Sequence, residues 1–427
     1  MPESLRVGVV GAGYVGLTSA ACLAELGHAV SCVDVDETKI AMLRAGEVPI
    51  SEPRLPELVA GHQEAGRLTF GTDLASLADA ELVLLCLPTP TGRGGTADLG
   101  AFDSALGTLR HVLAPDCVVA IKSTVPVGTG DRAARVLGLP VVSNPEFLRE
   151  GHAVADFLHP DRIVIGAHEE RAAARVEALY ARLDGPRLRT DPASAELAKY
   201  ASNAFLALKV SYVNELAELC ERVGADVTDV VGTMGLDDRI GAAFLSPGPG
   251  WGGSCLPKDT RALLHTAEET GMDFAVLADA VAANARQRDR VVAKIRHAAT
   301  GSRGGSLAGV RIGLLGLTFK AGTDDLRDSP ALAVAAALAA EGALLTGYDP
   351  GLARGADLAD VQLVDDPALA AKDAAALVLL TEWPQFRELN WSQLAQLTER
   401  ACLVDCRNLL HPAEVADAGF TYWGLGR

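Results

Sequence analysis

The chain has 427 residues, of which 49% are hydrophobic, and this length predicts two or three domains with well-buried cores. The formal net charge of −17 argues against nucleic acid or an anionic membrane surface as the main partner, because both would repel the molecule. The first residues lack a basic and then apolar targeting signal, and the uncharged stretches are too short to span a bilayer, so we expect a cytoplasmic protein.

The first half alternates short β-branched runs with longer helical patterns, which is typical of an α/β fold with a doubly wound parallel sheet. The runs cover residues 7–10, 30–35, 82–87, 118–123 and 141–143. Each leads into a polar or turn-forming group, namely Gly11, Asp34, Pro88-Thr89-Pro90, Thr124 and Asn144-Pro145-Glu146. The carboxyl ends of parallel strands line the ligand crevice of such a sheet, so we expect these groups to converge on one site.

The first of these turns carries the spacing of a dinucleotide-binding fingerprint, Gly11-Ala12-Gly13-Tyr14-Val15-Gly16. It follows a strand and opens a helix, where backbone amides and the helix dipole bind pyrophosphate. Asp34 ends the next strand at the position of a ribose-binding carboxylate, which favours NAD over NADP. The alternative is a structural turn followed by a solvated aspartate.

A long helix is predicted over residues 195–223, and it places Lys199 and Asn203 on one face, one turn apart. This pair could stabilise a developing oxyanion, although a lysine on a helix is more often a solvent-facing charge. More helix follows up to the Gly/Ser-rich linker at residues 300–305. Beyond it the order strand, turn, helix and strand returns over residues 310–349, which indicates a second nucleotide-type domain suited to a phosphate-bearing ligand.

Cys255 lies in a glycine-rich run that ends in Lys258-Asp259. The glycines allow a close approach of backbone and ligand, and Asp259 is the expected cap of the next helix. The thiol would then lie near a helix start, where the amide dipoles and Lys258 favour thiolate. A nucleophilic sulfur can trap a carbonyl so that a second hydride can leave. The alternative is a buried apolar filler, which we expect for the other seven cysteines.

Several charged residues are candidates only through their position. Glu146, at a strand end, could act as a general base for water. Four basic residues are possible phosphate or sugar contacts, although each alone is more often a surface charge: Arg239, Lys320, Arg327 and Arg407. The histidines and cysteines show no metal-ligand spacing, so no metal is expected.

Together these motifs resemble the UDP-glucose/GDP-mannose dehydrogenase family over essentially the whole chain. The resemblance is carried by residues 11–16, 123–129, 144–151, 196–199, 252–255, 258–259, 319–320 and 325–330. It implies two Rossmann-like doubly wound domains joined by a long central helix and a helical middle domain. The expected division is 1–194 for NAD binding, 195–300 for the central helix and dimerisation, and 301–427 for the nucleotide sugar.

The activity implied by this resemblance is a four-electron, NAD-dependent oxidation of the sugar 6-hydroxymethyl group to a carboxylate. Residues 237–241, with Phe244 and Leu245, resemble the UDP-glucose branch, whereas residues 256–263 also resemble the GDP-mannose branch. UDP-glucose is favoured, and GDP-mannose or a UDP-N-acetylhexosamine is the alternative. A single-oxidation hydroxyacid dehydrogenase, which has no use for Cys255, is a further alternative. A non-catalytic NAD-binding protein is another, and the assembled set of polar residues argues against it.

The resemblance also implies the roles of individual residues. Cys255 would be the nucleophile that forms a thiohemiacetal and then a thioester, with Lys199 and Asn203 stabilising oxyanions and Asp259 working with Lys199 and water. Glu146 would assist thioester hydrolysis, with Thr124 positioning water. The implied NAD contacts are Gly11, Gly13, Tyr14, Val15, Gly16, Asp34, Lys39, Pro88, Thr89, Thr124, Glu150, Lys258 and Arg327.

The implied nucleotide-sugar contacts come from all three expected domains. They are Glu146, Phe147, Leu148, Glu150, Lys199, Asn203, Arg239, Phe244, Ser246, Gly250, Trp251, Gly252, Phe319, Lys320 and Arg407. In the family, the counterpart of Arg239 reaches the sugar from a neighbouring subunit, so the resemblance implies a homodimer at least.

Overall fold

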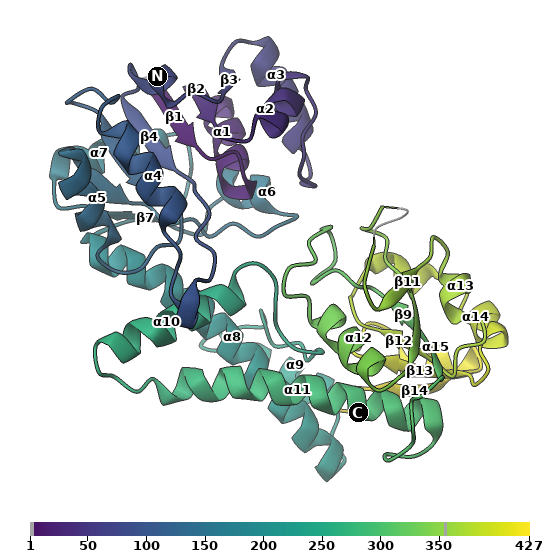
Figure 1. Cartoon of the computed structure of the whole chain (residues 1–427). Coiled ribbons are helices and arrows are strands. Elements are labelled where there is room, and N and C mark those ends of the chain that lie inside the picture. The colour runs from purple at the N-terminus through teal and green to yellow at the C-terminus, as the bar shows by residue number, and fades with distance from the viewer. Residues whose placement is uncertain (1–3, 354–356) are drawn as a thin grey trace. The chain divides into compact units, whose positions relative to one another are not determined.

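The structure, a computed structural model, describes residues 4–353 and 357–427 (Figure 1). The chain divides into two compact units. Unit 1 extends to Ser202 and includes Arg261–Thr270, and unit 2 comprises Asn203–Thr260 and Gly271–Arg427. Every helix in the described part of the chain is too short or too polar to cross a membrane.

Unit 1 is built on an eight-stranded sheet in the order β3-β2-β1-β4-β5-β6-β7-β8. All neighbouring strands are parallel except β6 and β7, which are antiparallel. The strand order reverses between β1 and β4, and such a switch point opens a crevice for a dinucleotide. The strands are β1 (Arg6–Val10), β2 (Ala29–Val33), β3 (Leu68–Gly71), β4 (Leu82–Leu85), β5 (Val118–Ile121), β6 (Val141–Ser143), β7 (Ile163–Gly166) and β8 (Arg187–Thr190).

Helices cover both faces of this sheet because its strands are apolar on both sides. Leu82 and Leu84 of β4 join the hydrophobic cluster formed with α1, α3 and α7, whereas Val83 and Leu85 join the cluster formed with α4 and α5. The helices are α1 (Tyr14–Glu25), α2 (Glu37–Arg44), α3 (Leu55–Glu64), η1 (Leu74–Leu77), η2 (Arg93–Gly95), α4 (Gly100–Leu109), α5 (Thr129–Leu137), α6 (Ala153–Leu158) and α7 (Glu170–Leu179).

Unit 2 carries a second parallel sheet, of six strands, in the order β11-β10-β9-β12-β13-β14. Residues of α11 and α12 pack against one face of it, and residues of α13, α14 and α15 pack against the other. Its strands are β9 (Arg311–Leu315), β10 (Leu344–Tyr348), β11 (Val361–Leu363), β12 (Ala376–Leu379), β13 (Cys402–Asp405) and β14 (Thr421–Gly424). The helices that follow β9 are α12 (Pro330–Ala340), α13 (Pro367–Ala371), η3 (Pro384–Glu388), α14 (Trp391–Leu397) and α15 (Pro412–Asp417).

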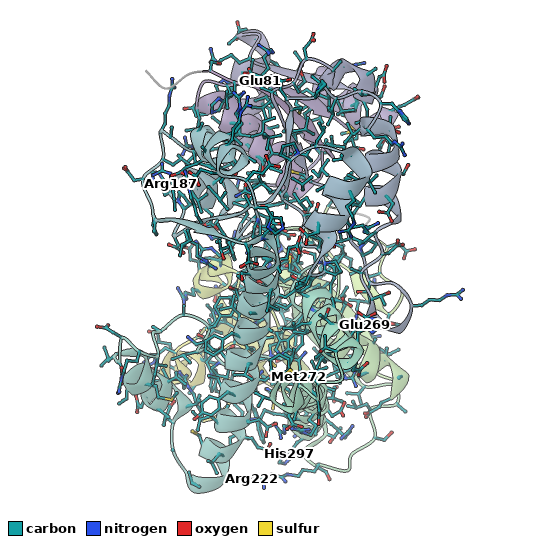
Figure 2. All side chains as sticks on the ribbon, turned by 90° about the vertical axis from the view of Figure 1, so that its left-hand side faces the viewer. Glu81, Arg187, Arg222, Glu269, Met272 and His297 are labelled. Atoms are coloured by element: carbon teal, nitrogen blue, oxygen red, sulfur yellow. The ribbon has the colours of Figure 1, made fainter. Side chains whose placement is uncertain are left out.

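Four further helices lie between the two sheets in sequence. They are α8 (Pro192–Val223), α9 (Val227–Gly235), α10 (Leu256–Glu269) and α11 (Ala275–Thr300). Helix α8 has 32 residues and passes from unit 1 into unit 2. Figure 2 shows this long helix with Arg222 on its last turn. It begins at Pro192, one turn earlier than the sequence predicts.

The fold class predicted from the sequence is confirmed, with two doubly wound parallel sheets and a long helix between them in sequence. The five predicted strand runs correspond to β1, β2, β4, β5 and β6. The prediction misses β3, β7 and β8 of this sheet, and of the second sheet it places only β9 and β10 by their residues. Strand β8 at the sheet edge has the polar sequence Arg187-Leu188-Arg189-Thr190, which lacks the apolar pattern of a buried strand.

Candidate active site

The turn after β1 requires glycine at two of its three fingerprint positions. Gly11 has a φ of 98°, and a Cβ atom there would lie 2.4 Å from the carbonyl oxygen of Cys86. A Cβ atom on Gly16 would lie 1.8 Å from the carbonyl oxygen of Gly11. Gly13 differs, because no atom lies within 4 Å of the position of its Cβ. The first and third glycines therefore close the turn, and Gly13 leaves open space at the start of α1.

This open space lies where an anion is favoured. Gly13 is the N-cap of α1 and makes no side-chain capping hydrogen bond, and the first turn contains no acidic residue. The amides of the first turn, including those of Tyr14 and Val15, therefore have no intrahelical acceptor, and the helix dipole adds partial positive charge. The geometry fits the pyrophosphate of a dinucleotide.

Asp34 follows β2 and lies beside the same turn. Its carboxylate accepts hydrogen bonds from the amides of Ala12 at 2.7 Å and Asp36 at 3.0 Å, and Lys39 Nζ lies 3.2 Å away. Partial burial acts to raise the pKa of Asp34, but these amides and Lys39 together hold it below its ordinary value. An ionised carboxylate at this position can accept hydrogen bonds from an adenosine ribose and repels a 2′-phosphate.

The second sheet has an equivalent aspartate with different surroundings. Asp349 follows β10, and its Oδ2 accepts hydrogen bonds from the amides of Leu317 and Thr318, the Thr318 hydroxyl and the Trp383 indole. Asp349 is buried, and α12 begins only at Pro330, with its first turn capped by Ser329. The turn after β9 therefore differs from the open glycine turn of unit 1, and a Cβ atom on its Gly316 would lie 2.5 Å from Thr381.

Glu146 and Lys199 form a buried ion pair in unit 1. Lys199 Nζ lies 3.1 Å from Glu146 Oε1, and the two side chains are 5% and 7% exposed. Glu146 Oε2 accepts the amide of Leu148 at 2.5 Å, and Lys199 Nζ lies 5.2 Å from the ring centroid of Phe147. The solvent-facing alternative for Lys199 is therefore wrong, since α8 presents it to the loop that follows β6.

Glu196 is a positioning residue to which sequence reasoning assigned no role. Its carboxylate accepts hydrogen bonds from the amides of Gly128 at 2.7 Å and Gly130 at 2.8 Å, and from Ser143 Oγ at 2.9 Å. Burial raises the pKa of Glu196, which these three hydrogen bonds oppose. The contacts fix the N-terminal part of α8 and hence the position of Lys199, three residues later.

A small polar cavity lies next to this pair. It has a volume of about 10 Å³ and is lined by Ile121, Ser123, Thr124, Val125, Ser143, Pro145, Glu196 and Lys199. This volume is about the size of one water molecule, and the lining offers hydroxyl, carboxylate and ammonium groups. Thr124 also accepts a hydrogen bond from Thr89 Oγ1 on its carbonyl, at 2.8 Å.

In unit 2, Asp259 is fully buried and connects two other candidates. Its Oδ2 accepts a hydrogen bond from Asn203 Nδ2 at 2.6 Å, and its Oδ1 lies 2.5 Å from Lys258 Nζ. The expected capping role of Asp259 is wrong. Helix α10 already begins at Leu256, and the amide of Asp259 donates to the carbonyl of Cys255 within the first turn.

Cys255 is exposed and directly precedes α10. The predicted position near a helix start is confirmed, although the helix begins before the expected cap at Asp259. The glycines before it are packed tightly: a Cβ atom on Gly252 would lie 2.0 Å from the Asp328 carbonyl oxygen, and one on Gly253 would lie 2.7 Å from the Phe319 ring. Gly250 and Gly253 have φ angles of 127° and 82°. These contacts fix the backbone that carries the thiol.

Trp251 supports the same loop from inside. Its indole N–H donates to Ser211 Oγ at 2.8 Å, and its amide and carbonyl both bond the Asn284 side chain. The indole is buried and turned into unit 2. We therefore assign the Trp251 side chain to holding the loop.

The other cysteines differ from Cys255 in exposure. Six of them are buried, as predicted: Cys22, Cys32, Cys86, Cys117, Cys220 and Cys406. Cys402 is half-buried. Among the described residues, no group of three or more His, Cys, Asp or Glu side chains has the arrangement of a metal site.

Of the remaining candidates, Tyr14 and Glu150 lie in unit 1 and Arg407 lies in unit 2. Tyr14 Oη contacts Glu52 and accepts the amide of Gly151, which ties α1 to the loop containing Glu150. In unit 2, Arg407 Nε donates to the Leu380 carbonyl at 2.8 Å and pairs with Glu382, and a Cβ atom on Gly248 would lie 2.9 Å from its Nη1.

Several further candidates are accessible on unit 2. Phe244 and Ser246 are exposed, and Lys320 Nζ lies 5.7 Å from the Phe319 ring centroid. Arg327 pairs with Asp325 at 2.7 Å. Arg239 pairs with Asp237 and is 89% exposed.

Comparison with known proteins finds one family along the chain. Residues 5–184 match the NAD binding domain of the UDP-glucose/GDP-mannose dehydrogenase family, residues 193–286 its central domain and residues 313–412 its UDP binding domain.

Individual relatives match over full length. A UDP-glucose 6-dehydrogenase of Rhizobium meliloti (strain 1021) is 45% identical over 99% of this chain and 100% of its own. The structure of a UDP-glucose dehydrogenase from Pyrobaculum islandicum has a TM-score of 0.90 at 35% identity, covering 100% of this chain and 98% of that one. The UDP-D-ManNAc dehydrogenase of Pyrococcus horikoshii has a TM-score of 0.89 at 28% identity, covering 99% of both chains.

Proposed function

Because the chain belongs to the UDP-glucose/GDP-mannose dehydrogenase family, we propose that it oxidises UDP-glucose to UDP-glucuronate in two NAD-dependent steps. The full-length similarity to UDP-glucose 6-dehydrogenases supports UDP-glucose as the substrate. The single observation that supports two successive oxidations is the exposed Cys255 directly before α10, because a single oxidation needs no thiol.

The geometry of unit 1 fits NAD. The open space at Gly13 and the uncapped start of α1 suit the pyrophosphate, and the ionised Asp34 suits the adenosine ribose. The nicotinamide supplies a hydride acceptor for each oxidation. Proposed contacts around this core are Tyr14, Val15, Lys39, Pro88, Thr89, Thr124, Glu150, Lys258 and Arg327.

The proposed chemistry centres on the Cys255 thiol. Loss of the C6 hydroxyl proton and of one hydride turns the alcohol into an aldehyde. The thiolate adds to the aldehyde carbon to form a thiohemiacetal, and loss of a second hydride and a proton leaves a thioester. Water then adds to the thioester carbon and the C–S bond breaks, giving the carboxylate and the thiol.

Lys199 and Asn203, one turn apart on α8, are proposed to stabilise the oxyanions of these steps. The Asp259 carboxylate holds the amide of Asn203 in a defined orientation. The Glu146 carboxylate, next to Lys199, is proposed to accept a proton from the attacking water, with Thr124 positioning that water.

The sugar nucleotide is proposed to contact two groups of residues. In unit 1 these are Phe147, Leu148 and Glu150, and in unit 2 they are Phe244, Ser246, Gly250, Gly252, Phe319, Lys320 and Arg407. We also propose a homodimer in which Arg239 serves the neighbouring subunit, because its side chain extends into solvent. A catalytic thiol needs reducing surroundings, which favours the cytoplasm as the site of the reaction.

The proposal is tested by counting NADH against sugar consumed, with UDP-glucose, UDP-N-acetylmannosamine and GDP-mannose compared at equal concentration. We expect two NADH per UDP-glucose and the highest kcat/KM with that substrate. One NADH per sugar would contradict the thioester route. A higher kcat/KM with another sugar nucleotide would reassign the substrate while leaving the chemistry in place.

A further inference from the structure

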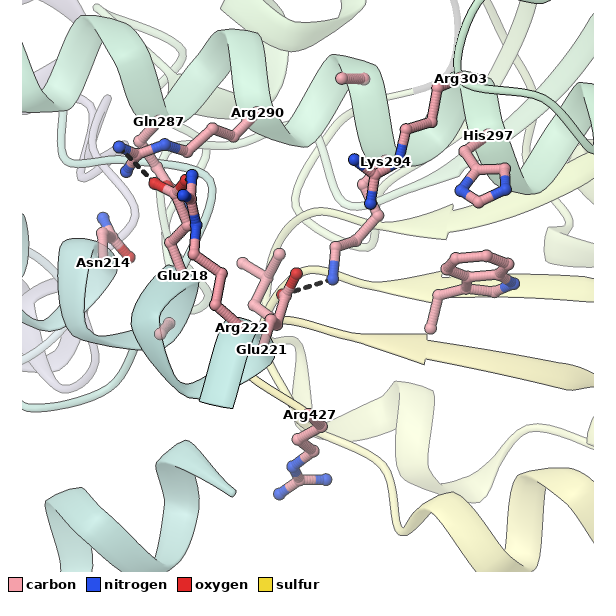
Figure 3. Close-up of a pocket in the computed structure, with 14 residues that line it drawn as sticks. Asn214, Glu218, Glu221, Arg222, Gln287, Arg290, Lys294, His297, Arg303 and Arg427 are labelled. Carbon is pink, nitrogen blue, oxygen red and sulfur yellow. Dashed lines mark hydrogen bonds and ion pairs between the residues drawn. The ribbon is translucent and has the colours of Figure 1, made fainter. Parts of the chain in front are cut away.

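A large cavity lies in unit 2 between the second half of α8, α11 with the segment after it, and β14 with the residues that follow (Figure 3). Its volume is about 710 Å³, within the range of pockets that bind small molecules. None of the residues proposed above for the reaction lines it. Asn203 and Asn214, the first cavity residue on α8, are separated by about 16 Å of helix at 1.5 Å per residue.

Two neutral hydrogen-bond donors of the lining are buried without an acceptor among the described residues. Asn214 is only 1% exposed, and its Oδ1 accepts the amide of Gly248 at 2.8 Å, which fixes the orientation of its amide group. Its Nδ2 and the indole Nε1 of Trp423 are both buried without a hydrogen-bond partner. A buried donor without an acceptor is unfavourable, so both point to an acceptor-bearing ligand.

The cavity is also basic, in contrast to the net charge of −17 for the chain. Five cations line it, Arg222, Arg290, Lys294, Arg303 and Arg427, against the two carboxylates of Glu218 and Glu221. Figure 3 shows Lys294 paired with Glu221, and Arg290 pairs with both Glu218 and the neighbouring Glu215. Arg222 pairs with Glu218 and is 73% exposed at the rim, and Arg427 pairs with Asp226. Glu218 would keep its pair with Arg290 if Arg222 turned away. Among the described residues Arg303 forms no ion pair.

We propose that this cavity binds a small phosphorylated molecule carrying at least two phosphate groups. Guanidinium groups match phosphate oxygens in bidentate geometry, and Arg222 and Arg303 can turn toward such a ligand without leaving a buried charge unpaired. The Asn214 amide and the Trp423 indole supply neutral donors at the buried end. The site is separate from the oxidation of the sugar nucleotide and does not depend on it.

The test measures tripolyphosphate binding by calorimetry to the full-length protein in saturating NADH and UDP-glucose. These ligands occupy the proposed phosphate sites of the reaction, and the mixture cannot turn over. The wild type is expected to bind one tripolyphosphate per chain. The Arg222→Ala/Arg303→Ala variant should bind it at least about tenfold more weakly, because two charge-assisted contacts are lost. Arg288→Ala, an exposed arginine of α11 outside the cavity lining, is the matched control and should bind as the wild type does.

A second variant tests the buried end of the cavity. Asn214→Asp keeps the acceptor for Gly248 but replaces the donor with a carboxylate, so tripolyphosphate binding should be lost while kcat stays unchanged. ATP in place of tripolyphosphate distinguishes a nucleotide ligand, if it binds more tightly, from recognition of phosphate alone. Undetectable binding of both probes to the wild type would overturn the proposal. Equal affinity in the wild type and both cavity variants would overturn it as well.

Discussion

Cys255 differs from the other cysteines in accessibility, which leads to a prediction about chemical modification. Burial raises the pKa of Cys22, Cys86, Cys117 and Cys406 to about 12, so at pH 8 only about one in ten thousand of these thiols is ionised. We expect iodoacetamide to label Cys255 at least about tenfold faster than these four thiols, as measured by peptide mass spectrometry. Activity should fall in step with labelling at Cys255. Full activity after complete labelling there would rule out its nucleophilic role.

Asp34 should make a pH-dependent contribution to stability. Burial opposes its ionisation, but two amides and Lys39 hold its pKa below the value near 3.9 of an unfolded chain. The folded state therefore binds this proton less tightly, and the stabilisation is present above about pH 4 and lost as the pH falls through the folded pKa. The difference in unfolding free energy between wild type and Asp34→Asn should be constant from about pH 7 to 5 and shrink below about pH 4.

Chemical denaturation at several pH values measures this difference. The exposed Asp289→Asn serves as control and should change stability little at any pH. A difference for Asp34→Asn that grows as the pH falls would show that the hydrogen bonds to Asp34 do not favour its ionised form.

Individual site residues were predictable where local sequence determines the geometry. The Gly11 to Gly16 turn and Asp34 after β2 lie where spacing predicted them, and Cys255 lies near a helix start as expected. The role of Glu196 was not predictable, because its partners Gly128 and Gly130 are more than 60 residues away in sequence. The ion pair between Lys199 and Glu146 was not predictable for the same reason, because Glu146 belongs to the distant loop after β6.

At the scale of elements, the anchoring of α8 by Glu196 should affect both stability and rate. In Glu196→Gln the carboxamide leaves one oxygen to accept from two amides and a hydroxyl and places an NH₂ group against the other donors. We expect a loss of about 1–3 kcal/mol in unfolding free energy. We also expect a lower kcat at unchanged KM for NAD, because Lys199 loses its fixed position.

Glu177→Gln on α7 is the matched control, because Glu177 forms ion pairs with Arg187 and Arg189 near the surface of unit 1. Such pairs are worth about 0–1 kcal/mol, so this variant should keep its stability and kcat. If Glu196→Gln behaved in the same way, the N-terminal part of α8 would be held by other contacts.

Apolar patterns placed β1, β2, β4, β5, β6, β9 and β10 as well as the long helix α8, and the errors have physical causes. Edge strand β8 is too polar for its pattern to reveal it. Helix α10 starts at Leu256, directly after the glycine-containing loop that ends at Cys255. Asp259, which would be a good cap by composition, is instead buried beside Asn203 of another helix.

At the scale of the molecule, one face of α8 is exposed and apolar, which supports the proposed homodimer. Phe205, Tyr212 and Leu219 recur at seven-residue spacing and are 61%, 56% and 52% exposed. Phe205→Glu/Tyr212→Glu should give a monomer by light scattering, because burial of charges in the apolar interface is unfavourable. Leu188→Glu, at an exposed apolar residue of β8, is the control and should remain a dimer. A double variant that remains dimeric would place the subunit contact elsewhere.

The central claim, that the sugar is held on Cys255 as a thioester, is tested most directly by mass spectrometry of Glu146→Gln after mixing with NAD and UDP-glucose. Loss of the proposed base should slow thioester hydrolysis more than hydride loss. We predict a UDP-glucuronosyl adduct on the peptide that contains Cys255, and none in Glu146→Gln/Cys255→Ala. Formation of UDP-glucuronate by that double variant, or an adduct on any other residue, would contradict the account.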